Sequence, residues 1–64
     1  MRQGMHLDLN EREADLLELL LVKELEETRV ELHHARNIEF KAELREREKM
    51  VHLLLERMKV AVTN

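Results

Sequence analysis

The stretch from Leu16 to Val22 constrains the fold of this chain more than any other feature of the sequence. Six of its seven residues are large and apolar. On a helix with about 3.6 residues per turn, these side chains point in every direction around the axis. One partner helix therefore cannot cover them all, and we expect more than one helix to surround this segment.

The length and composition of the chain favour a small all-helical protein. Its 64 residues make one domain, and folding of a domain this small hides only about 60% of the surface of the unfolded chain. The sequence contains no cysteine, so the remaining sources of extra stability are a metal, unusually good helix packing, or association. Glycine occurs once and proline never. With Leu, Glu, Arg and Lys abundant, this composition is typical of long helices.

Two asparagines mark the expected helix starts. Asn10 is followed three residues later by Glu13, which is the spacing of a capping box. Asn37 precedes a second apolar period and is a suitable N-cap. The sequence therefore predicts a single domain over residues 1–64, with a flexible arm at 1–9, a first helix at 10–35, a turn at 36–37 and a second helix at 38–60.

Each predicted helix carries one stripe of mostly apolar residues at helical spacing. The stripe of the first helix comprises Ala14, Leu17, Leu21, Leu25, Thr28, Leu32 and Ala35. The stripe of the second comprises Phe40, Leu44, Arg47, Val51, Leu54, Leu55 and Met58. Folding the chain back at Arg36 brings these stripes together in register. We predict an all-α fold, an antiparallel two-helix hairpin.

Several apolar residues lie outside these stripes and predict that the hairpin associates with itself. They are Leu16, Leu19, Leu20, Met50, Leu53 and Ala61. Burying one large apolar side chain stabilises a protein by roughly 1.5–3 kcal/mol relative to leaving it in water. We therefore expect two hairpins to pack through these residues into a four-helix bundle. The relative direction of the two hairpins stays open, as does a higher oligomer, and a groove for a helix of another protein is the alternative.

Two patterns that contain histidine could in principle form a functional site. Glu31 and His34 have the Glu-x-x-His spacing of di-iron bundles, but both lie off the apolar stripe, and the adjacent His33 diverges from His34 by about 100° on a helix. We interpret them as weak metal-ligand candidates on a solvated face and expect neither a metal nor a cofactor. His52 lies between Glu48 and Glu56 at i,i+4 spacing, which is typical of a stabilised helix surface.

Arg47 is the one charged residue within an apolar stripe. In the first interpretation its stem packs against the stripe while the guanidinium reaches the edge of the bundle, near Glu24 or Glu43. In the second, Arg47 specifies the register or the partner, as polar residues do at coiled-coil core positions.

Part of the sequence resembles a group of short uncharacterised bacterial proteins. The resemblance is carried by Arg29-Val30-Glu31-Leu32, Glu39-Phe40-Lys41, Leu44, Arg47-Glu48 and the leucines from Leu53 to Leu55. It implies a helical hairpin and no enzyme class. Members of the group tend to have threonine at the position of Ala35.

The sequence narrows the function mainly by exclusion. A net charge of −3 argues against nucleic acid as a partner, since binding phosphates needs a basic face. The longest apolar run, Leu19 to Val22, is far shorter than the roughly 20 residues of a membrane helix. No secretion signal is apparent, so we expect a cytoplasmic protein.

The sequence also contains no recognisable catalytic signature, so we expect no enzymatic activity. The favoured function is a small homo-oligomeric interaction or scaffold protein. The alternative is an accessory, antitoxin-like regulatory subunit that presents Leu16–Val22 to another protein, and a metal-binding four-helix bundle is the third possibility.

Overall fold

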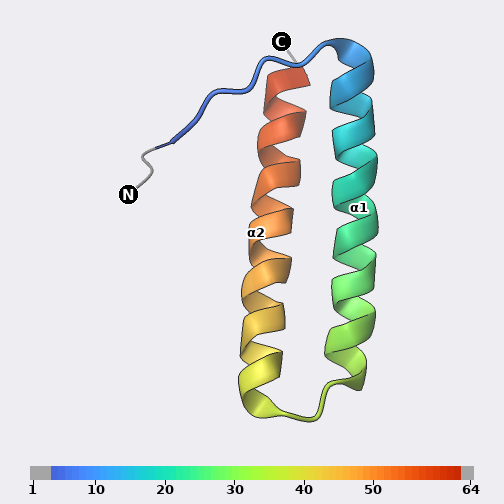
Figure 1. Ribbon diagram of the computed structural model, residues 1–64, viewed down its shortest axis with the longest axis vertical. Helices are drawn as coiled ribbons and strands as arrows, with labels where there is room; N and C mark the ends of the chain where they lie inside the picture. Colours follow the sequence, from blue (N-terminus) through green and yellow to red (C-terminus); the bar gives the residue numbers. More distant parts are fainter. Residues whose placement is uncertain (1–3, 63–64) are drawn as a thin grey trace.

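The computed structural model of the chain describes residues 4–62, and of residues 60–62 the backbone only. Helix α1 (Glu11–His34) and helix α2 (Ile38–Val62) run antiparallel and are joined by a short turn (Figure 1). The predicted all-α hairpin is confirmed. The helix ends differ by one or two residues from the predicted ranges: Ala35 has extended backbone and ends α1, while α2 continues to Val62.

Both asparagines cap their helices as predicted. The Asn10 side chain accepts a hydrogen bond of 2.8 Å from the Glu13 amide, and the Glu13 carboxylate accepts one of 3.0 Å from the Asn10 amide. The Asn37 side chain accepts from the amides of Glu39 and Phe40, at 2.8 and 3.1 Å. These bonds satisfy amides that have no partner within a helix, and they fix where each helix begins.

A narrow core holds the two helices together. Its buried apolar residues are Leu25, Leu44, Val51 and Leu55. Among the described polar side chains, only that of Thr28 is buried. The Thr28 hydroxyl donates to the Glu24 carboxylate at 3.3 Å. Every residue of the stripe predicted for the first helix is buried or half-buried, so that prediction is confirmed.

The stripe predicted for the second helix is wrong at three positions. Phe40, Arg47 and Leu54 are exposed, while Lys41 and Glu48 are half-buried in their place. The reason is the rotation of α2 about its axis, which points Leu44, Val51 and Leu55 at α1 and leaves the 40-47-54 row at one edge. This rotation places the Arg47 side chain at a half-exposed edge, where its charge loses less hydration than it would in the core.

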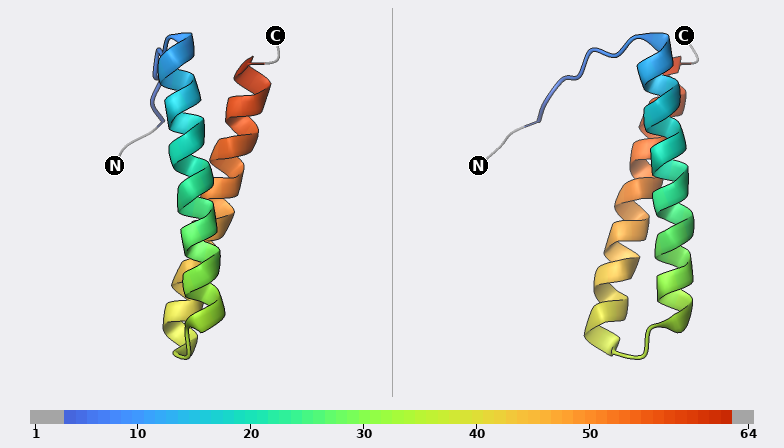
Figure 2. Two further views of the ribbon diagram at one scale, coloured as in Figure 1. Left: turned by 90° about the vertical axis from the view of Figure 1, so that its right-hand side faces the viewer. Right: turned by 45° about the vertical axis from the view of Figure 1, so that its right-hand side comes forward.

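The helices cross at an angle. In the left view of Figure 2, their ends near the chain termini lie apart while their turn ends overlap. The arm that precedes α1 runs from the start of that helix across toward the end of α2 (Figure 1). Neither of the described helices is both long and apolar enough to cross a membrane.

Candidate interaction surface

Two ion pairs show which residues share each side of the hairpin. Arg47 Nη1 lies 3.7 Å from Glu24 Oε2, and Arg29 Nε lies 3.0 Å from Glu48 Oε2. Glu24 and Arg29 are five residues apart, which places them about 140° apart around α1. The two pairs therefore lie on opposite sides of the contact between the helices.

The side marked by Arg47 and Glu24 carries exposed leucines and a methionine. Counting back from Glu24 in steps of four leads to Leu20 and Leu16, and Met50 and Leu54 lie three and seven residues after Arg47, so they follow the same face of their helices. All four side chains are exposed, Leu20 by 52% and Leu54 by 45%. We call Leu16, Leu20, Met50 and Leu54 the apolar flank.

The opposite side of the hairpin is charged. Residues at helical spacing from Arg29 and Glu48 are almost all ionisable: Glu18 on α1, and Lys41, Arg45, His52, Glu56 and Lys59 on α2. Val22, seven residues before Arg29, and Ile38, seven residues before Arg45, are the apolar exceptions. We call this side the charged flank. A charged side that stays in water needs no partner, whereas a row of exposed large apolar residues marks a surface for association.

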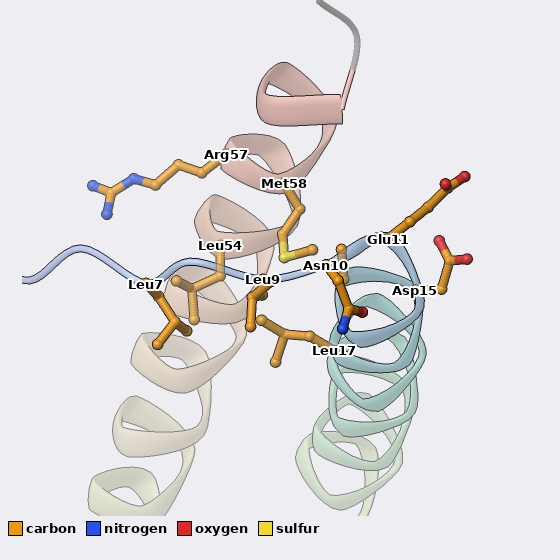
Figure 3. A pocket seen from close by; sticks show the side chains of 10 residues that line it. Leu7, Leu9, Asn10, Glu11, Asp15, Leu17, Leu54, Arg57 and Met58 are labelled. Carbon is orange, nitrogen blue, oxygen red and sulfur yellow. The ribbon is translucent and has the colours of Figure 1, made fainter.

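A groove of about 560 Å³ lies at the end of the hairpin that holds the chain termini. Its lining comes from the arm and both helices and comprises Leu7, Leu9, Asn10, Glu11, Ala14, Asp15, Leu17, Leu54, Arg57 and Met58. Figure 3 shows the side chains of Leu7, Leu9, Leu17 and Leu54 directed into the same space. Because Leu54 belongs to both features, the groove continues the apolar flank.

The position of the arm beside both helices was not predicted from the sequence. Leu7 and Leu9 are two residues apart, and this spacing places side chains on one side of an extended segment. That alternation was the available signal. Both leucines remain partly exposed, so the arm adds apolar surface to this end of the hairpin without closing it.

The predicted interface residues are divided among three locations. Leu16, Leu20 and Met50 lie on the apolar flank. Leu19 lies two residues before Leu21, and Leu53 lies two residues before Leu55. Both side chains therefore point about 160° away from the helix contact, and both are exposed. The side chain of Ala61 lies outside the described residues.

The metal candidates Glu31 and His34 lie about one helical turn apart near the end of α1. Glu31 and His34 are both exposed, and the rings of His33 and His34 meet edge to face with centroids 5.3 Å apart. Among the described residues, no three His, Asp or Glu side chains are placed to hold a metal ion.

Arg47 reaches Glu24, one of the two partners named for it from the sequence. Its side chain is half-exposed at the edge of the contact between the helices. Whether Arg47 also selects a register or a partner stays a prediction.

Comparisons with known proteins add nothing to this geometry. No family model, curated protein or solved structure matches the chain. The resemblance to bacterial helical-hairpin proteins stays a prediction.

Proposed function

We propose that this protein is a small, non-enzymatic interaction module of the cytoplasm whose first partner is a second copy of itself. Two hairpins pack through their apolar flanks into a four-helix bundle, and the outer surface of the bundle binds other proteins. The observation that carries this proposal is the segregation of the exposed leucines. Leu16, Leu20 and Leu54 follow one side of the hairpin together with Met50, whereas the opposite side carries mostly charged residues.

The extent of the exposed surface supports association. The chain exposes 6136 Å², whereas a compact monomer of 7.7 kDa exposes about 4,300 Å². The extended arm accounts for part of this difference. The side chains of Leu16, Leu20, Met50 and Leu54 contribute to it as well, because each is 45–56% exposed.

The size of the core points the same way. Within the described residues, only four apolar side chains are buried, and single cores in chains this short rarely supply more than about 3–5 kcal/mol. Covering Leu16, Leu20, Met50 and Leu54 adds a second apolar layer of the same size. A bundle of four helices also gives each helix two neighbours instead of one.

A second candidate function is a regulatory subunit, antitoxin-like in manner, that offers its surface to a different protein. The groove between the arm and the helix ends supports this alternative. Grooves lined by leucine and methionine accept the apolar face of an amphipathic helix. In that case Leu17, Leu54 and Met58 would bind the foreign helix.

Sedimentation of a matched pair of variants tests the proposal. Leu20→Glu places a carboxylate on the apolar flank, whereas Val22→Glu places the same group on the charged flank. Both positions are exposed on α1 and lie outside the hairpin core. We expect wild type and Val22→Glu to sediment as dimers and Leu20→Glu as a destabilised monomer.

Two results would contradict self-association through this flank. One is a wild-type protein that sediments as a monomer across the concentration range. The other is a Leu20→Glu variant as dimeric as Val22→Glu. A monomer that becomes larger only when another protein is added would favour the regulatory subunit.

A further inference from the structure

We propose that the two copies pair about a two-fold axis that runs along the hairpins, so that both turns lie at the same end of the bundle. This inference rests on the proposed function and adds the arrangement of the partner. It follows from how charge and apolar residues are distributed along and across one hairpin.

Face-to-face packing of two identical flanks permits two simple two-fold arrangements. In an isologous contact the same patch is used by both subunits. An axis along the hairpins places each α1 against the α2 of the partner, with both turns together. An axis across the hairpins, from α1 to α2, places each α1 against the α1 of the partner, with the turns at opposite ends.

The charges of the helices favour the axis along the hairpins. Helix α1 has eight acidic residues and three lysines or arginines, a net charge of −5, and α2 has five acidic and six basic residues, a net charge of +1. The axis along the hairpins sets −5 beside +1. The axis across them sets −5 beside −5, and like charges brought together disfavour an arrangement.

The position of the apolar flank along the hairpin selects the same arrangement. Its four residues all lie between the Arg47–Glu24 pair and the ends that hold the termini. On the turn side of that pair, the same side of the hairpin carries the exposed carboxylates of Glu27, Glu31 and Glu43. An axis along the hairpins packs leucine against leucine. An axis across them packs leucine against leucine only when it passes through the apolar flank, and the offset then leaves the turn halves of both hairpins without a partner.

Leu20 and Leu54 make the contact self-complementary. The residue numbers of the two ion pairs add up to 71 for Glu24 with Arg47 and 77 for Arg29 with Glu48. Residues of α1 and α2 whose numbers add up to a value in this range lie at the same level, and those of Leu20 and Leu54 add up to 74. The axis along the hairpins therefore places Leu20 opposite the partner's Leu54, and Leu54 opposite the partner's Leu20.

Distance measurement between spin labels tests the arrangement. The chain has no cysteine, so Arg36→Cys gives one labelling site in the exposed turn. Helices that pack together lie about 10 Å apart, so we expect a separation below about 25 Å between the labels. The axis across the hairpins separates the turns by the length of a helix, which is about 36 Å for α1.

A second label keeps the test independent of the turn. Glu11→Cys lies at the other end of α1 and is also exposed, and the same short separation is expected there. Dimers with long separations at both sites would overturn this arrangement and leave the proposed function standing. If the labelled proteins and wild type all sediment as monomers, both the arrangement and the proposed function are overturned.

Discussion

Arg47 and Glu24 form an ion pair of 3.7 Å at the edge of the helix contact, with 51% and 41% of their side chains exposed. Exposed pairs of this kind contribute under about 1 kcal/mol to stability. The pair is more informative as a boundary. Toward the chain termini its side of the hairpin carries the apolar flank, with Glu13 and Arg57 beyond it. Toward the turn it carries Glu27, Glu31 and Glu43 beside the exposed Phe40.

Replacing Arg47 tests what its charge does at this boundary. Arg47→Leu removes a weak ion pair and extends the apolar flank by one residue beside Met50. We expect an unchanged dimer whose melting temperature, followed by circular dichroism, is equal to or a few degrees above that of wild type. Arg45→Leu on the charged flank is the control and should give no increase.

Other outcomes for Arg47→Leu have distinct meanings. A mixture of oligomers, seen by sedimentation, would show that Arg47 specifies register or partner. A clear loss of stability would contradict the half-exposed position and indicate a buried, paired charge in the assembled protein.

Shortening two leucines of α2 separates the core from the outer face. Leu44 is 1% exposed, and Leu44→Ala should reduce the free energy of unfolding by about 2–5 kcal/mol, because the side chain leaves a cavity. Leu53 points away from α1, so Leu53→Ala should change the free energy of unfolding by about 0.5 kcal/mol or less. Urea unfolding at one fixed protein concentration measures both. A large loss of stability in Leu53→Ala would indicate that Leu53 lies in an interface, as the sequence predicted.

Chelation tests the metal-binding possibility. The exposed Glu31 and His34 lie apart from the core, so adding a chelator should leave the helix content and the melting temperature unchanged. The double variant Glu31→Ala with His34→Ala should stay within about 1 kcal/mol of wild type, since each surface change usually costs about 0.5 kcal/mol or less. Elemental analysis of protein purified without chelator completes the test. A stoichiometric metal, or melting that falls on chelation, would contradict this expectation.

Local signals in the sequence were sufficient to predict the hairpin itself. Asn10 and Asn37 each cap through side-chain bonds to amides within three residues, and such short-range chemistry can be read directly from spacing. The α1 stripe was equally clear, because Leu21, Leu25 and Thr28 repeat at steps of four and three. The turn was predicted from the short gap between the two helical patterns.

The rotation of α2 was not predictable from its own spacing. Phe40, Arg47 and Leu54 form one row, and Leu44, Val51 and Leu55 form another beside it. Both rows fit a helical period, so only contact with α1 decides between them. The choice moved Leu54 from the core to the apolar flank. The arm was missed for a related reason, since Leu7 and Leu9 acquire a role only next to Leu17 and Leu54.

The central claim is that folding and self-association are one event. If the hairpin completes its apolar core only in the dimer, the melting temperature must depend on protein concentration by mass action. Thermal unfolding of wild type across a hundredfold range of concentration measures this most directly. We predict a melting temperature that rises steadily with concentration. An invariant melting temperature, together with a monomer at the highest concentration, would contradict the account and assign the apolar flank to a different partner.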